Sequence, residues 1–121
     1  LPIAVGLALA NRKDDVYCMV SDGECTEGSI WEALCIANEQ KLTNLKIIIN
    51  ANGWSAYNSV DVPYLMKRIK AFGFFVKKTN GHDMKTIKKQ LLTQKNDKPL
   101  VLFAYTVVNQ FPFLQGLDAH Y

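Results

Sequence analysis

The sequence lacks the features that would set this chain apart from ordinary globular proteins. It has few cysteines, no apolar run near the ~20 residues that a membrane-spanning helix needs, and no basic segment before the apolar stretch 1–10. We therefore expect neither a transmembrane segment nor a signal peptide. The first residue is not Met, so we expect the chain to begin inside a longer protein or to be a processed piece.

The cysteines do not match a disulfide framework or a zinc site. Cys18, Cys25 and Cys35 are odd in number and form no C-x-x-C pair. Cys18 lies in an apolar run and Cys35 in a helix-like stretch, so we expect buried, inert thiols. This use of cysteine favours a reducing, cytoplasmic setting.

The chain does contain enough apolar material for one folded domain. Of 121 residues, 49% are hydrophobic and 21% are charged, which is typical of a soluble globular domain. Residues 1–66 hold four basic and eight acidic groups (net −4), and residues 67–98 hold ten basic and two acidic groups (net +8). Because the basic residues of 67–70 and 85–89 alternate with apolar ones, we interpret them as the solvent faces of two amphipathic helices and expect no nucleic-acid partner.

Helix-like and strand-like segments alternate along the chain. We expect strands near 16–20, 46–49, 74–77 and 99–106, and helices near 1–11, 27–40, 62–73 and 83–94. The first helix is apolar almost all round and the first strand (VYCMV) is continuously apolar, so both are expected to be fully covered. This alternation predicts an α/β fold with a parallel sheet, right-handed crossovers and helices on both faces. The segments after the strands, which include 21–26 and 79–83, should then meet at one edge, where such sheets bind ligands.

Two of these segments carry oxygen ligands of the kind that hard cations prefer. Asp22 directly follows a strand, Gly23 allows close approach of the backbone, and the next helix begins nearby with exposed N–H groups. The segment 50–55 offers amide and backbone carbonyl oxygens. Asp22 and Asn52 therefore suggest a site for Mg²⁺ and a diphosphate. From the residues alone, an ordinary polar turn stays an alternative.

The spacing of these residues resembles the thiamine diphosphate motif of the transketolase family. Ser21-Asp22-Gly23, thirty residues from Asp22 to Asn52, and then Gly53 are similar to the motif GDG, spacer, Asn. The stretches LPIAVGLALA, GECTEGSIWEA, KLTNLKIII, NGHD and KPLVLFAYTV also look like transketolase, over nearly the whole chain. The resemblance implies that residues 1–121 are a thiamine diphosphate- and Mg²⁺-binding domain, as a fragment or as part of the amino-terminal subunit of a split transketolase.

The resemblance also implies roles for single residues. It gives Asp22, Asn52 and the Trp54 carbonyl as ligands of Mg²⁺. From the donor chemistry alone, Ca²⁺ is the other candidate ion. The catalytic residues that the resemblance implies are Glu27, which matches a carboxylate network between cofactor sites, and His120, which matches a histidine that can face phosphate. Stabilisation of a helix dipole is the alternative for Glu27. The cofactor-binding set is Asp22, Gly23, Glu24, Asn52 and Trp54.

Three further positions have structural readings that we favour over catalytic ones. Trp31 and Glu32 match family positions, but we expect them to pack the helix and its partner surface. His82 should lie on the ligand-binding edge, where we expect a cap or turn role.

The activity implied by the resemblance is transfer of a two-carbon ketol unit from a ketose to an aldose. In the family, a pyrimidine-binding domain supplies the Glu that activates the cofactor. We therefore expect this chain to need such a domain or subunit, in a dimer or another homo- or hetero-oligomer that acts on a sugar or sugar phosphate.

The chain departs from the family pattern at three places, and other functions stay open. Ser21 replaces the first glycine of GDG, Asn50 stands where Asp is common, and Val107–Phe113 replaces a Lys-Gly-rich loop. One alternative is the α-chain of a 2-oxoacid dehydrogenase, which shares the GDG…N anchor, although GECTEGSIWEA argues against it. Another is a non-catalytic subunit that keeps the fold for partner binding, although the retained Asp22 and Asn52 argue against it.

Overall fold

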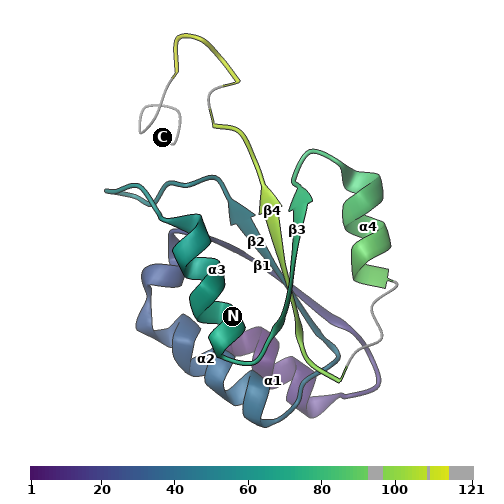
Figure 1. Cartoon of the computed structure of the whole chain (residues 1–121). Helices are drawn as coiled ribbons and strands as arrows, with labels where there is room; N and C mark the ends of the chain where they lie inside the picture. Colours follow the sequence, from purple (N-terminus) through teal and green to yellow (C-terminus); the bar gives the residue numbers. More distant parts are fainter. Residues whose placement is uncertain (93–96, 109, 115–121) are drawn as a thin grey trace.

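The chain folds around a four-stranded parallel sheet with the strand order β1-β2-β4-β3 (Figure 1). The computed structural model describes residues 1–92, 97–108 and 110–114. The strands are β1 (Val16–Ser21), β2 (Leu45–Ala51), β3 (Phe75–Asn80) and β4 (Leu100–Tyr105). The helices are α1 (Pro2–Ala10), α2 (Gly28–Glu39), α3 (Val62–Ala71) and α4 (Met84–Leu92), with a 3-10 turn η1 (Glu24–Thr26) after β1.

The strand order explains why the helices divide between two faces of the sheet. From β1 through β2 to β3 the chain advances across the sheet, and from β3 to β4 it turns back. Right-handed crossovers then require α2 and α3 on one face and α4 on the other. Figure 1 shows this arrangement, with α1 on the side of α2 and α3. The predicted α/β fold with a parallel sheet and helices on both faces is confirmed.

The main core lies between the sheet and helices α1, α2 and α3. Alternate strand residues point into it, among them Ile47 and Ile49 of β2 and Phe103 of β4. On α3, buried Leu65 and Ile69 face this core. The basic side chains of α3 and α4 lie on their exposed faces, as predicted: Lys67, Arg68, Lys70, Lys85, Lys88 and Lys89.

The prediction that the first strand and the first helix are fully covered is wrong. Tyr17 and Met19 of β1 are 47% and 67% exposed, and Ile3 and Leu7 of α1 are also exposed. β1 is an edge strand, and within the described residues α4 is the helix on that face of the sheet. An apolar run shows that a segment can be buried, but not that a neighbour is there to bury it.

Two smaller expectations also need correction. Cys35 is exposed on α2 and Cys18 is half-buried, so only Cys25 is a buried thiol. β3 continues to Asn80 instead of ending at 77, because Thr79 and Asn80 pair with β4 before the chain turns. In the part of the chain that the structure describes, no helix is long and apolar enough to cross a membrane.

Candidate functional site

The carboxyl ends of the four strands lie at one edge of the sheet, as the sequence predicts. In the register, Ser21 at the end of β1 is opposite Asn50 of β2, and Asn80 at the end of β3 is opposite Tyr105 of β4. Backbone bonds extend the pairing past the strand ends, with Asp22 N donating to Asn50 O at 3.1 Å. The segments after β1 and β2 are thereby brought side by side.

Asp22 is the buried centre of this edge. Its side chain is 0% exposed, and its Oδ2 accepts a hydrogen bond from the backbone N–H of Gly53 at 2.7 Å. Its Oδ1 accepts from the Gly23 N–H at 3.0 Å. A buried carboxylate is tolerated only where donors or cations compensate it. Asp22 therefore joins the loop after β1 to the loop after β2, next to Asn52.

Gly23 is needed because the two loops touch. Its backbone (φ −64°, ψ −40°) is one that any residue adopts, so the requirement is for space. A Cβ at this position would lie 2.9 Å from Ser55 Cα and 3.2 Å from the Trp54 carbonyl oxygen. The Trp54 carbonyl, predicted as a metal ligand, thus lies beside the turn that carries Asp22.

The loop after β2 is held in shape by its own hydrogen bonds. Asn52 Oδ1 accepts from Trp54 N at 2.8 Å, and Gly53 adopts a φ of +81°, which favours glycine. Val60 N donates to Gly53 O at 2.8 Å, and Trp54 forms a short bridge with Ser59. The side-chain oxygen of Asn52 is therefore held by its own loop, and the next residue, Gly53, binds the Asp22 carboxylate.

The turn after β1 contains a capping box that was not predicted from the sequence. Glu24 Oε2 accepts from Ser21 N at 2.7 Å, and Ser21 Oγ accepts from Glu24 N at 3.0 Å. Ser-x-x-Glu is the known signature of this motif and could have been recognised. Ser21, the departure from GDG, therefore has a structural role, and Glu24, predicted to bind cofactor, has its carboxylate in this turn.

Glu27, one of the two predicted catalytic residues, directly precedes α2. It is the N-cap residue, it is exposed, and its side chain makes no capping hydrogen bond. His120, the other predicted catalytic residue, lies outside the described residues.

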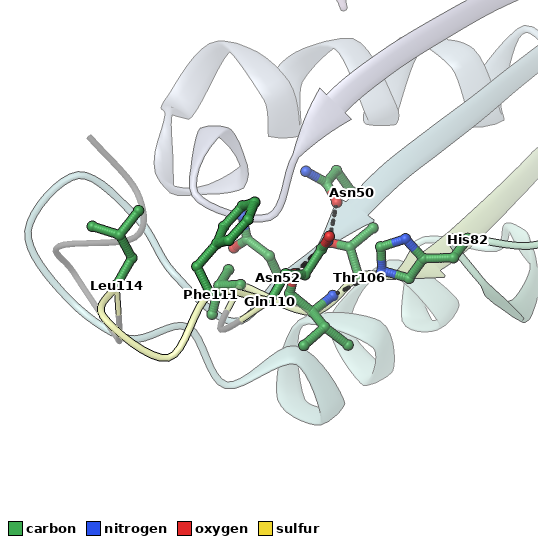
Figure 2. Close-up of a pocket in the computed structure, with 9 residues that line it drawn as sticks. Asn50, Asn52, His82, Thr106, Gln110, Phe111 and Leu114 are labelled. Carbon is green, nitrogen blue, oxygen red and sulfur yellow. Dashed lines mark hydrogen bonds between the residues drawn. The ribbon is translucent and has the colours of Figure 1, made fainter.

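A cavity of about 440 Å³ lies beside Asn52 at the same edge. Figure 2 shows Asn50 from the end of β2 and Thr106 from the end of β4 meeting there. Thr106 Oγ1 donates to Asn50 Oδ1 at 2.6 Å. The remaining described lining is His82, Val107, Val108, Gln110, Phe111 and Leu114, so the departures at Asn50 and in the loop after β4 both face this cavity.

His82 fixes the chain as it leaves β4. Its Nε2 accepts a hydrogen bond from Val107 N at 3.1 Å, and its own backbone N–H donates to Asn80 Oδ1 at 2.9 Å. Asp83, next to it, caps the start of α4 by accepting from Thr86 N and Thr86 Oγ1. These bonds lower the pKa of Asp83. The structure thus gives His82 the turn role that the sequence analysis favoured.

The oxygen-rich character of the edge limits which metals it could hold. Among residues 1–92, 97–108 and 110–114, no three His, Cys, Asp or Glu side chains cluster in a way that could bind a metal ion. The candidate ligands predicted from the sequence are the Asp22 carboxylate, the Asn52 amide oxygen and the Trp54 carbonyl oxygen. Such hard oxygen donors suit Mg²⁺ or Ca²⁺, and they do not suit softer transition metals.

Comparison with known families and sequences gives consistent matches. The family described as "Transketolase, thiamine diphosphate binding domain" matches residues 8–119. The chain is 39% identical to one of the subunits of apulose-4-phosphate transketolase from Actinobacillus succinogenes, over 96% of this chain and 46% of that protein. It is 32% identical to transketolase of Homo sapiens, over 88% of this chain and 18% of that protein.

Comparison with solved structures gives the same fold. Transketolase from Campylobacter jejuni superposes with a TM-score of 0.76 at 32% identity, covering 85% of this chain and 19% of that one. Transketolase from Leishmania mexicana superposes with a TM-score of 0.68 at 26% identity, covering 85% of this chain and 18% of that one. The chain therefore spans less than half the length of each of these four relatives.

Proposed function

The chain belongs to the transketolase family as a thiamine diphosphate-binding domain, and from that premise we propose that its carboxyl sheet edge anchors the cofactor's diphosphate through Mg²⁺. The observation that carries this proposal is the buried Asp22 carboxylate, hydrogen-bonded to Gly53 and thus next to Asn52. Thirty residues separate Asp22 from Asn52 in the sequence, and the hydrogen bond from Gly53 N to Asp22 links Asp22 to the residue that follows Asn52, which supports the proposal.

The residues at the edge fit a magnesium ion. Asp22, Asn52 and the Trp54 carbonyl would hold it, because Mg²⁺ takes oxygen ligands and shares its remaining positions with phosphate and water. The close packing of Gly23 on Ser55 and Trp54 supports the same assignment. Because Gly23 has no Cβ, its backbone lies directly against the loop after β2. Ca²⁺ would bind the same donors with a less strict coordination geometry than Mg²⁺.

The proposed reaction is transfer of a two-carbon ketol unit between sugars, for which bound thiamine diphosphate supplies an electron sink. The residues of this chain bind and orient: they hold the diphosphate and so direct the reactive ring toward a second surface. We propose that a pyrimidine-binding domain or subunit provides that surface, in a dimer or other oligomer. Two relatives are themselves single subunits of apulose-4-phosphate transketolases, which supports a divided enzyme.

The roles of Glu27 and His120 are part of this proposal. Glu27, exposed at the start of α2, is free to join a carboxylate network between cofactor sites. His120 would face a phosphate group of cofactor or sugar phosphate. We also propose a cytoplasmic setting, which is supported by the three free cysteines, Cys18, Cys25 and Cys35.

Calorimetry on the assembled protein tests the anchor. Asp22→Ala should weaken Mg²⁺-dependent binding of thiamine diphosphate at least tenfold, about 1.4 kcal/mol. Asp61→Asn is the matched control, because it removes a carboxylate of α3 and keeps an N-capping side chain. Unchanged affinity in the Asp22 variant would refute the assignment.

An activity assay tests the divided site. Ketol transfer should be absent with this chain alone and should appear when the pyrimidine-binding partner is added. Turnover by the chain alone, with Mg²⁺ and thiamine diphosphate, would show that a complete site lies within these residues.

A further inference from the structure

Trp31 of α2 connects the turn after β1 to helix α3. Its indole Nε1 donates a hydrogen bond to the carbonyl oxygen of Cys25 in η1 at 2.9 Å. The guanidinium of Arg68 on α3 lies 3.9 Å from the centre of the Trp31 ring. The ring of Phe72 packs against it with centroids 5.3 Å apart. One side chain of α2 therefore contacts both η1 and the C-terminal part of α3.

The carbonyl that Trp31 holds is close in the chain to the metal-binding candidate. Cys25 N donates to the carbonyl oxygen of Asp22 at 3.2 Å. The Cys25 side chain is 3% exposed, and its Sγ donates to Ser21 O at 3.4 Å. A shift of the Cys25 backbone would therefore also displace Ser21 and Asp22, to which Cys25 is hydrogen-bonded.

Arg68 acts on the same turn through its charge. The pKa of Cys25 is raised to about 12, first by burial and then by the negative charges of Asp22 and Glu24, while the positive charge of Arg68 lowers it. The guanidinium is thus within electrostatic reach of the acidic turn. Its planar face is also suited to stacking on an indole ring in a way that a lysine ammonium is not.

We propose that Trp31 and Arg68 are positioning residues for diphosphate binding: Arg68 fixes the Trp31 ring, and Trp31 fixes the turn that carries Asp22 and Gly23. This inference rests on the proposed function, because it concerns the affinity of the same site. Neither residue is among the described residues that line the cavity beside Asn52. Their link to the turn of Asp22 and Gly23 is the hydrogen bond from Trp31 to Cys25 O, so their effect on the cofactor would pass through η1.

The first experiment measures opening of the turn without any cofactor. The assembled protein is pulse-labelled with N-ethylmaleimide, and modification of each cysteine is read by peptide mass. Exposed Cys35 is the internal reference for reagent. Trp31→Phe keeps a six-membered aromatic ring but removes the hydrogen-bond donor together with the pyrrole part of the indole, so Cys25 should be labelled about fivefold faster.

Variants of α3 separate stacking from charge. Arg68→Gln should also accelerate labelling of Cys25, and Arg68→Lys should restore protection only in part, because it keeps charge without the planar stack. Lys67→Gln is the matched control, since it removes a neighbouring exposed charge that lies outside the Trp31 contacts. It should label like the wild-type protein.

The second experiment links the turn to the cofactor. Calorimetry with thiamine diphosphate and Mg²⁺ should show about fivefold weaker binding to Trp31→Phe, while urea unfolding shows that the variant is folded under the assay conditions. A purely structural role would lower the urea midpoint and leave the affinity of the folded protein unchanged.

The outcomes distinguish the two proposals. If the wild-type protein shows no Mg²⁺-dependent binding of thiamine diphosphate, the proposed function is wrong. If it binds and the Trp31 and Arg68 variants bind equally well, the proposed function stands and the positioning role is wrong. Unchanged protection of Cys25 in both variants would also overturn the positioning role.

Discussion

Replacing Gly23 by alanine tests whether the two loops of the site are as close as the structure has them. Gly23 has the backbone angles of a right-handed helix, which alanine adopts without strain. By itself, an alanine here would stabilise the protein by about 0.4–1 kcal/mol, because it restricts the unfolded chain. Any destabilisation must therefore come from contacts made by the added methyl group.

The contacts available to that methyl group are too short. It would lie 2.9 Å from Ser55 Cα, 3.0 Å from Ser55 Cβ and 3.2 Å from the Trp54 carbonyl oxygen. The nearest atom is backbone, so rotation of a side chain cannot relieve the clash. Overpacking of this kind costs about 1–3 kcal/mol, which leaves a net loss centred on about 1.3 kcal/mol, and at most about 2.6 kcal/mol, after the gain in the unfolded state.

Urea unfolding of Gly23→Ala and Gly6→Ala provides the comparison. Gly6 lies inside α1 with nothing within 4 Å of an added Cβ, so the same chemical change should stabilise the protein by up to about 1 kcal/mol there. Gly23→Ala should also weaken Mg²⁺-dependent cofactor binding, because the displaced loop carries Asn52 and Trp54. A Gly23 variant as stable as the wild-type protein would refute the close packing of the loops.

Two further predictions concern a helix cap and a buried thiol. Asp61→Ala should lower the free energy of unfolding by about 1 kcal/mol in urea, whereas Asp61→Asn should be near neutral, because Asp61 caps α3 by accepting from Tyr64 N. The raised pKa of Cys25, about 12 against 9.0 for a free thiol, means that the folded state holds its proton more tightly. Stability from this group is complete below pH 9 and is lost as pH rises toward 12, so wild type should lose more stability over that range than Cys25→Ala; equal loss would contradict the burial.

Much of this site could be predicted from the sequence because it depends on order along the chain. Alternating strands and helices imply parallel strands, and parallel strands bring the segments after them to one edge. That logic correctly brought together the segments of Asp22 and Asn52. It gave no reason to expect that Gly53 N–H would bind the Asp22 carboxylate, since this contact joins residues 31 positions apart.

Other features could not be predicted because they depend on what lies next to a segment. The run VYCMV is apolar throughout, yet the side chains of Tyr17 and Met19 are exposed to solvent because β1 lies at the sheet edge. Asn80-Gly81 is typical of a turn, but pairing with β4 extends β3 to Asn80. The capping box of Ser21 and Glu24 is different, because Ser-x-x-Glu is readable from the sequence. Comparison with the GDG motif, by contrast, shows only that Ser21 stands where the motif has a glycine.

The lining of the cavity beside Asn52 bears on the proposed reaction, because it limits which groups of a sugar the cavity could bind. Its described polar lining is made of the amides of Asn50, Asn52 and Gln110, the Thr106 hydroxyl and the His82 ring, and the rest is apolar. Such groups can bind sugar hydroxyls and a carbon chain, whereas a phosphate group is best bound by arginine, lysine or a helix N-terminus. A sugar phosphate would therefore depend on charged groups outside this lining. The departures at Asn50 and in 107–113 are thus compatible with the proposed reaction, in which His120 or a second surface would supply the phosphate contacts.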